Sequence, residues 1–288
     1  GKRIRPRLVW AFAHCLEHPP PQLPLLDLAV AAELIHSGSL LHDDVLDQGQ
    51  MRRGRETVNV RWGNTVAVLA GDMMLVRALG LLREHPAEIS ATAVETVASM
   101  TEAVISEVES RGRLELSPEH WRRIAAGKTG ALFAWCGRAV ALLAGEPCVA
   151  ADLARCGRAL GIAFQLADDL IDLVGRRSGK TRYSDLKNRE LSYPILVAAA
   201  HSAGDRAAIS ALWKMDPPTD DAVREVGQRL LAGVALPRTV HQISRELTGA
   251  LEALGPRRDR PGGLLIDRWA RKLGAQFIEP TLAAAKER

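Results

Sequence analysis

The sequence predicts an all-α fold, and three observations support this. Of its 288 residues, 47% are hydrophobic and 25% are charged, which is typical of a globular protein with a large buried core. Only 4% are aromatic, and runs of β-branched residues are scarce beside Ala, Leu, Arg and Glu, which favour helices. Apolar residues recur with the period of a helix, and no segment alternates as a strand would.

Helical periodicity and helix breakers divide the chain into elements. Prolines at 19–21 and at 24 separate the first two helices, Ser117-Pro118 has the pattern of a helix start, and Gly145-Glu146-Pro147 ends a helix. A loop is expected over 175–193. We predict about ten helices in a single domain over residues 1–288, preceded by a further N-terminal segment because the chain begins at Gly1 inside a basic motif. The five clearest predicted helices span 25–46, 65–82, 87–108, 129–143 and 150–173.

Charge and motif content exclude several classes of protein. The net charge of +4 comes without a basic stripe studded with aromatic residues, so no nucleic-acid partner is expected. The longest apolar stretch, 130–145, contains Arg138 and is shorter than the roughly 20 residues that span a bilayer, so no transmembrane segment is expected. The sequence lacks P-loop, dinucleotide-binding, zinc-protease and α/β-hydrolase motifs.

The four cysteines lack the spacing of zinc ligands. We expect them to be small buried residues in a reducing cytoplasm, which predicts a cytoplasmic protein. They are Cys15, Cys136, Cys148 and Cys156.

Three aspartates end the first long predicted helix. Asp43, Asp44 and Asp47 follow an apolar helical run at positions i, i+1 and i+4, which places Asp43 and Asp47 one turn apart on the same face. Their mutual repulsion costs helix stability unless a cation or protons neutralise them. One such cluster alone is also compatible with a solvated acidic helix end.

The same spacing recurs at Asp168, Asp169 and Asp172, again within a strongly apolar helix. A solvated helix end could explain one copy of this destabilising carboxylate pattern, but it does not explain two copies within apolar helices. Hard oxygen ligands without His or Cys favour Mg²⁺, which usually binds through one or two carboxylates plus substrate phosphates. The sequence therefore predicts two facing helices that hold a diphosphate through bridging Mg²⁺ ions.

Basic residues accompany both clusters, as a phosphate ligand requires. The chain opens with Gly1-Lys2-Arg3-Ile4-Arg5-Pro6-Arg7, and Arg52-Arg53-Gly54 follows the first cluster. Lys128-Thr129 begins a predicted helix, and Lys180 lies in the loop after the second cluster. Arginine binds phosphate through its two-pronged donor geometry and lysine as a point charge. Each cation alone is typical of a solvated surface. Only their joint placement near both aspartate clusters indicates a phosphate-binding site.

These motifs, in this order, resemble the trans-isoprenyl diphosphate synthases, the polyprenyl synthetase family, over nearly the whole chain. The resemblance also includes Gly71-Asp72 and Phe164-Gln165. It implies an isoprenoid-synthase-type bundle of mostly antiparallel helices around a deep central cavity, assembled as a homodimer. The implied reaction is the Mg²⁺-dependent head-to-tail (1'-4) condensation of isopentenyl diphosphate with an allylic prenyl diphosphate, with three Mg²⁺ ions per active site.

The resemblance also implies a role for each candidate residue. The metal ligands would be the two aspartate clusters, with Asp168 and Asp172 leading in the second. Thr129 and Gln165 would stabilise the allylic cation by their oxygen dipoles, and Lys128 would act beside them on the allylic diphosphate. The remaining substrate-binding residues are Arg52 and Lys180 for the allylic diphosphate, and Lys2, Arg5, His36 and Arg53 for isopentenyl diphosphate.

Product length depends in this family on how deep the cavity runs below the first aspartates. One turn before them this chain has Gly38 and Ser39 where a bulky aromatic residue would close the channel, and the aspartate motif has no two-residue insertion. We therefore expect products of geranylgeranyl length or longer. A deeper floor formed by Met73, Met74, Phe133 and Trp135 is an alternative, although core packing is the commoner role of such residues.

Two departures from the family pattern leave alternatives open. Glu190 stands where a lysine is usual, four residues before Pro194, and the segment 107–116 matches poorly, so that helix is expected to be locally remodelled. A class I terpene cyclase shares the fold and one aspartate-rich site but normally lacks the second cluster. A non-catalytic partner subunit of a heteromeric synthase normally has an eroded aspartate motif.

Overall fold

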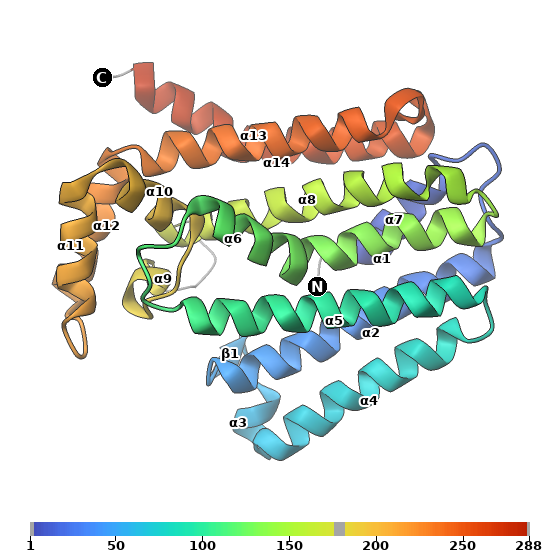
Figure 1. Ribbon diagram of the computed structural model, residues 1–288, viewed down its shortest axis with the longest axis horizontal. Helices are drawn as coiled ribbons and strands as arrows, with labels where there is room; N and C mark the ends of the chain where they lie inside the picture. Colours follow the sequence, from blue (N-terminus) through green and yellow to red (C-terminus); the bar gives the residue numbers. More distant parts are fainter. Residues whose placement is uncertain (1–2, 176–181, 287–288) are drawn as a thin grey trace. The chain divides into compact units, whose positions relative to one another are not determined.

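The protein is all-α, as predicted, in a computed structural model that describes residues 3–175 and 182–286, with side chains up to residue 275 (Figure 1). Within these ranges it contains fourteen α-helices, more than the ten predicted, because several are short. They are α1 Ile4–Ala13, α2 Gln22–Leu46, α3 Val58–Trp62, α4 Asn64–Leu82, α5 Ala87–Ser110, α6 Pro118–Ala125, α7 Ala131–Leu143, α8 Pro147–Val174, α9 Ser184–Lys187, α10 Tyr193–His201, α11 Ala203–Trp213, α12 Asp220–Ala232, α13 Ala235–Ala253 and α14 Pro261–Lys286.

The five long predicted helices are confirmed as α2, α4, α5, α7 and α8, with ends that differ by up to three residues. The predicted helix start is also confirmed, because Ser117 caps α6 by accepting a hydrogen bond from the backbone N–H of His120 and Pro118 is the first helical residue. The sequence did not reveal a short antiparallel hairpin, β1 Met51–Arg52 with β2 Arg55–Glu56, nor helix α9 inside the expected loop. It also missed a π-helical turn, Ala126–Gly130, between α6 and α7.

The chain forms two compact units, each assembled from separate stretches of sequence. The first unit comprises residues 1–98, 132–157 and 254–266. In it, α2 packs along α4 and also contacts α1, as Figure 1 shows. The buried face of α2 is aliphatic, with Leu28 and Ile35 almost completely inaccessible. This packing leaves the C-terminal end of α2, which carries the first aspartate cluster, beside the hairpin.

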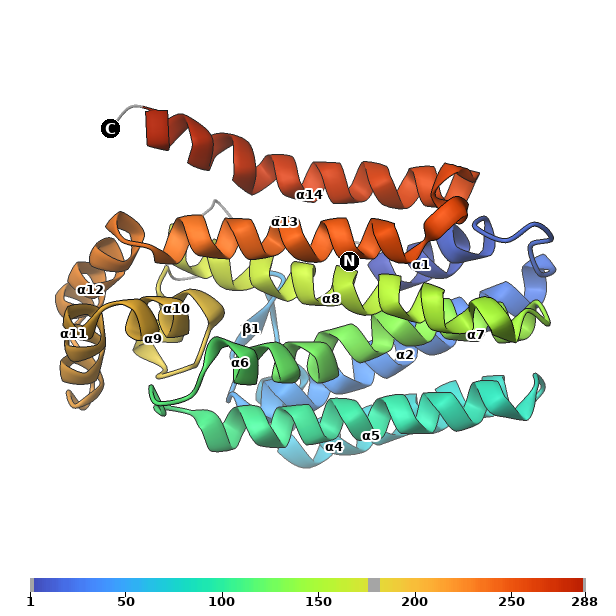
Figure 2. The same cartoon turned by 45° about the horizontal axis from the view of Figure 1, so that its top comes forward.

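The second unit comprises residues 99–131, 158–253 and 267–288. Helix α10 contacts α11, α13 and α6, and α12 lies beside α11, as Figure 2 shows. The core of this unit includes Leu173, Tyr183, Ile195, Ile209 and Trp213. The indole N–H of Trp213 donates to the carbonyl of Leu186 (2.9 Å), which fixes α9 to this core.

The prediction that all four cysteines are buried is wrong for one of them. Cys15, Cys136 and Cys156 are buried, and burial raises the pKa of the Cys15 and Cys136 thiols to about 12. Cys148, in the first turn of α8, is exposed. All four are free thiols.

Helices α2 and α4 are long and apolar enough, by length and composition alone, to cross a membrane. This is weak evidence, since core helices of water-soluble proteins meet the same criterion. Within the window tested, 39% of α2 and 22% of α4 is buried inside the protein. Most of the apolar surface of α4 is therefore not covered by the rest of the protein.

Candidate active site

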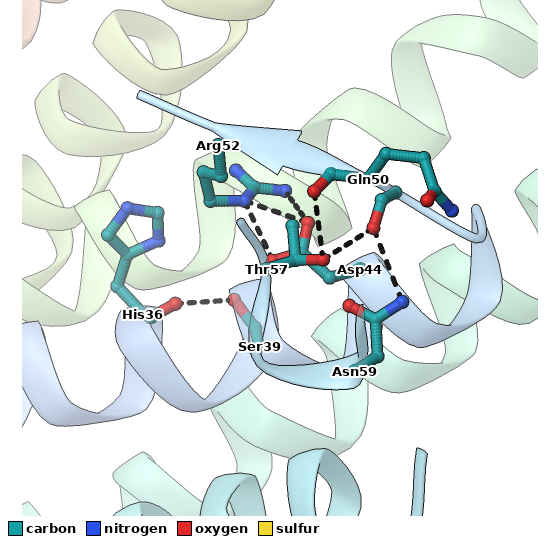
Figure 3. Close-up of polar contacts among 8 residues, drawn as sticks. His36, Ser39, Asp44, Gln50, Arg52, Thr57 and Asn59 are labelled. Atoms are coloured by element: carbon teal, nitrogen blue, oxygen red, sulfur yellow. Dashed lines mark hydrogen bonds and ion pairs between the residues drawn. The ribbon is translucent and has the colours of Figure 1, made fainter. Parts of the chain in front are cut away.

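The first aspartate cluster lies at the C-terminal end of α2, where the helix dipole is negative. This position adds to the repulsion among the three carboxylates. Asp44 is buried (6% exposed) and is neutralised by Arg52, whose Nε lies 2.9 and 3.0 Å from the two carboxylate oxygens (Figure 3). Asp43 is half-buried and Asp47 is exposed. Asp44 therefore anchors the cluster, and Asp43 and Asp47 are the more accessible carboxylates.

Arg52 reaches Asp44 because it lies on the β1–β2 hairpin. The two turn residues, Arg53 and Gly54, both have positive φ (54° and 77°), as a tight two-residue hairpin requires. The start of the hairpin is fixed by hydrogen bonds to the Gly49 carbonyl from Thr57 Oγ1 (2.6 Å) and Asn59 Nδ2 (3.2 Å), which Figure 3 shows. The hairpin thus places Arg52 and Arg53 at the end of α2.

His36 and Arg5 form a basic group with these arginines in the first unit. Burial, together with the charges of Arg5, Arg53 and Arg52, lowers the pKa of His36 to about 3, so its imidazole is neutral at physiological pH. Arg5 lies over the ring of Phe133 (5.2 Å to the centroid), and burial lowers its pKa to about 10. The buried Nε of Arg5 has no hydrogen-bond partner among the described residues. A buried cation with an unsatisfied donor fits an anionic ligand.

The second aspartate cluster, on α8, has its three carboxylates in three different environments. Asp168 is exposed. Asp169 is buried and accepts hydrogen bonds from Gln165 Nε2 (3.1 Å) and the backbone N–H of Tyr193 (2.9 Å), and burial raises its pKa to about 7. Asp172 accepts hydrogen bonds from the backbone N–H groups of Ser184 (3.0 Å) and Asp185 (3.2 Å), and from the Ser184 hydroxyl. Asp172 therefore caps α9, and Asp168 is the most accessible carboxylate of the three.

Lys128 and Thr129 lie in the π-helical turn rather than at a regular helix start. Thr129 Oγ1 donates to Gln165 Oε1 (2.9 Å), and Gln165 Nε2 in turn donates to Asp169. Lys128 Nζ lies 2.5 Å from a carboxylate oxygen of Glu107, in the last turn of α5. The π turn widens the helix at this point, a feature that is frequent at functional sites. The result is an ordered chain of polar groups leading to the second cluster.

The structure thus gathers most of the predicted site residues into two groups, one in each unit. Arg5, His36, Arg52 and Arg53 accompany the first aspartate cluster, and Lys128, Thr129 and Gln165 accompany the second. Ser39 Oγ donates to the carbonyl of His36 (2.9 Å). Gly38 faces α4, where an added Cβ would lie 3.0 Å from the Gly71 carbonyl oxygen. Lys2 and Lys180 lie outside the described residues. It remains a prediction that the two clusters face each other across a central cavity.

Sequence reasoning missed two acidic residues. Glu107 pairs with Lys128, although it begins the stretch that matched the family poorly. Asp185 in α9 has its pKa raised well above the ordinary value by burial and by the charges of Asp169, Asp172 and Glu190. In the sequence, only their charge distinguished Glu107 and Asp185. Their roles could not be predicted, because each acquires its partners through tertiary packing. Glu190 therefore adds negative charge to this region where a lysine is usual.

The less buried carboxylates of the two clusters have the chemistry of a magnesium site. Asp43, Asp47 and Asp168 offer hard oxygen donors, which Mg²⁺ prefers. Among the described residues, no three His, Cys, Asp or Glu side chains already converge on a metal position. Mg²⁺ is usually held by one or two carboxylates and completed by substrate phosphates and water. The basic groups on the same elements supply the matching contacts for those phosphates.

Comparison with known proteins identifies the family to which the chain belongs. Residues 1–230 match the family described as polyprenyl synthetase. The chain belongs to this family. It is 36% identical over 247 residues to (2E,6E)-farnesyl diphosphate synthase of Mycobacterium tuberculosis, covering 81% of this chain and 67% of that protein. It is 33% identical over 267 residues to the nonaprenyl diphosphate synthase of the same species, covering 91% of this chain and 79% of that protein.

Solved structures agree with the sequence matches. A decaprenyl diphosphate synthase from Rhodobacter capsulatus has a TM-score of 0.89 at 29% identity, covering 96% of this chain and 86% of that one. A polyprenyl synthase from Caulobacter crescentus, complexed with calcium and isoprenyl diphosphate, has a TM-score of 0.89 at 27% identity, covering 96% and 85%. These matches confirm the predicted family, the isoprenoid-synthase fold and the prenyltransferase class of this polyprenyl synthetase.

Proposed function

We propose that this polyprenyl synthetase catalyses the Mg²⁺-dependent head-to-tail condensation of isopentenyl diphosphate with an allylic prenyl diphosphate. The observation that carries the proposal is that both aspartate clusters are intact and that each keeps accessible carboxylates beside its own cations or oriented dipoles. The products are all-trans polyprenyl diphosphates. Neither a cyclase nor a non-catalytic subunit requires this complete set.

In the first unit, the basic group would hold isopentenyl diphosphate. Arg5 supplies a buried donor without a protein partner, so it can donate to a diphosphate oxygen without losing an existing hydrogen bond. His36, neutral among three arginines, can donate one ring N–H to the same group. Arg53 projects from a two-residue turn that fixes its backbone. Lys2, on the same basic segment, would complete the set.

In the second unit, Lys128, Thr129 and Gln165 would act on the allylic substrate. The hydrogen bond from Thr129 to Gln165, and the next from Gln165 to Asp169, fix the direction of both oxygen dipoles before substrate arrives. Dipoles that are oriented in advance stabilise a developing carbocation without reorganisation. Water exclusion strengthens this effect and protects the cation from being quenched. Glu107 keeps Lys128 near this group until a diphosphate competes for it.

Asp43, Asp47 and Asp168 would hold Mg²⁺, and Arg52 and Lys180 would bind the allylic diphosphate. Bound there, Mg²⁺ offsets the negative charge that builds on the departing pyrophosphate. Asp44 and Asp172 have another task in this proposal, because Asp44 orients Arg52 and Asp172 orients α9. The proton lost after the condensation would pass to the pyrophosphate, so no activated Ser or Cys is needed.

Product length should be geranylgeranyl or longer. Gly38 and Ser39 leave little bulk one turn before Asp43, and the Cβ of Met74 lies 3.5 Å from the position that a Cβ on Gly38 would occupy. A larger residue at 38 would have to push α2 and α4 apart, because an added Cβ would already lie 3.0 Å from the Gly71 carbonyl oxygen. Farnesyl, octaprenyl and nonaprenyl synthases all occur among the relatives, so the relatives alone do not choose a length.

The enzyme should be a homodimer that pairs through α4. Val66, Leu69, Met73 and Val76 are 45–63% exposed and recur at intervals of three, four and three residues. This spacing places them in one apolar seam, which is typical of a helix that packs against another helix. A seam of this kind left in water favours association.

The same seam explains the membrane-like composition of α4 without a membrane crossing. Asp72 lies near the middle of α4 and is 55% exposed. A carboxylate at the centre of a bilayer costs about 2.5–3.5 kcal/mol on insertion scales. We therefore keep the predictions of no transmembrane segment and of a cytoplasmic location as parts of this proposal.

The direct test is to incubate the purified chain with Mg²⁺, labelled isopentenyl diphosphate and farnesyl diphosphate, and to size the dephosphorylated products. We expect geranylgeraniol or longer alcohols, and none from Asp43→Ala. Cyclic hydrocarbons would instead indicate a terpene cyclase. A folded protein without turnover would indicate a partner subunit.

A further inference from the structure

His42, immediately before the first aspartate, contacts α4 through its imidazole ring. Its Nε2 lies 3.2 Å from the carbonyl oxygen of Val68 and 3.4 Å from a carboxylate oxygen of Asp72. A backbone carbonyl can only accept a hydrogen bond, so Nε2 carries the proton in this contact. The imidazole therefore spans one turn of α4.

Gly71 is the residue that allows this contact. A Cβ at position 71 would lie 2.3 Å from His42 Nε2 and 2.6 Å from His42 Cδ2. Real Cβ atoms do not approach other heavy atoms so closely, so any other residue at 71 would displace the ring or the helix. The Gly71-Asp72 pair in the sequence thus has a structural explanation: glycine admits the imidazole and aspartate faces its N–H.

The end of α2 needs such an anchor. Three carboxylates in or next to its last turn repel one another and oppose the helix dipole. Arg52 holds this end from the hairpin, through Asp44. The contacts of His42 hold it from α4. Two anchors on different elements fix both the position and the rotation of the last turn, and hence the direction in which Asp43 and Asp47 project.

We propose that His42, Gly71 and Asp72 form a positioning lock that sets how Asp43 and Asp47 present their carboxylates to a divalent cation. The lock touches no reacting atom, so His42 is a positioning residue rather than a catalytic one. This inference rests on the proposed function, because it concerns the affinity of that site for its cation. Residues that orient metal ligands typically change metal affinity by 10–100-fold, and we expect about tenfold here.

The chain offers a matched control for the lock. His85 Nε2 lies 3.0 Å from a carboxylate oxygen of Asp27, which is on the same helix α2. Asp27 precedes Asp43 by 16 residues, or about 24 Å along the helix. Asp27→Asn therefore weakens a similar His–Asp contact without reaching the aspartate cluster.

The test measures Mn²⁺ binding by the electron paramagnetic resonance signal of the free ion, with farnesyl diphosphate present and isopentenyl diphosphate omitted so that no condensation takes place. We compare His42→Ala, Gly71→Ala, the double variant His42→Ala/Gly71→Ala and Asp27→Asn with the wild type, and record each melting temperature. Gly71→Ala should lose both stability and Mn²⁺ affinity. The double variant should recover stability, because the overlap is gone, but should keep the tenfold weaker Mn²⁺ binding.

Wild-type Mn²⁺ affinity in His42→Ala and in the double variant would overturn the proposal, because His42 and Gly71 would then contribute only to packing. An equal loss in Asp27→Asn would also overturn it, because the effect would not be specific to the end of α2. Failure of the proposed function has a different signature. In that case wild-type protein makes no elongated product with both substrates and Mg²⁺, whatever the variants do to Mn²⁺ binding.

Discussion

Individual side chains in the candidate site have environments that their sequence positions do not disclose. The sequence places Asp43 and Asp47 on one helix face, but it does not show that Asp44 alone is buried against Arg52. In the same way Asp168 is exposed while Asp169 and Asp172 are hydrogen-bonded internally. The presence of the clusters could be predicted because their spacing is local. Their division of labour could not, because the partners come from other elements.

The stability of the enzyme should depend on the protonation of His36. Its pKa falls from an unfolded value of about 6.5 to about 3 in the folded protein, so folding favours the neutral ring. The stabilisation is complete above pH 6.5 and is lost as the pH falls from 6.5 towards 3. Between pH 7.5 and 5.5 the wild type should lose about 1 kcal/mol more than His36→Gln. Urea unfolding of both proteins at the two pH values measures this difference, and parallel losses would contradict it.

Elements with strong internal periodicity were predictable, and elements made by tertiary contacts were not. Helices α2, α4, α5, α7 and α8 carry their apolar pattern over many residues, which fixed their location within a few positions. Helix α9 has only four residues, and it depends on Asp172 at its start and on Trp213, which bonds to Leu186. The π turn depends likewise on contacts of Thr129 and Lys128 with other helices.

Helix α9 should unfold locally more often when Asp172 is truncated. Asp172→Ala removes the acceptor for the N–H groups of Ser184 and Asp185, and losing a helix cap costs about 1 kcal/mol. Hydrogen exchange at residues 184–187 should become faster, and the melting temperature should fall. Asp168→Ala is the matched control, since Asp168 is exposed, and it should leave exchange and stability unchanged while product formation falls. Equal stability losses in both variants would contradict the assigned roles.

The exposed apolar seam on α4 predicts that the protein is a dimer. Leu69→Glu introduces a charge at a position that is 62% exposed in the single chain, so it should fold normally but weaken pairing at least tenfold. Leu264→Glu, at a residue that is 54% exposed on α14, is the control. Sedimentation velocity should show a dimer for the wild type and the control and a monomer for Leu69→Glu. A wild-type monomer at micromolar concentration would refute the pairing.

We infer that the two aspartate clusters, which lie in separate units, serve one chain-elongation reaction. The most direct test measures elongation of farnesyl diphosphate by labelled isopentenyl diphosphate in the wild type, Asp43→Ala, Asp168→Ala and the control Asp27→Asn. The expected result is products of geranylgeranyl length or longer from the wild type and the control. Each cluster variant should lose at least a hundredfold in elongation rate, which corresponds to about 3 kcal/mol of transition-state stabilisation. Near wild-type elongation by either Asp43→Ala or Asp168→Ala would contradict it.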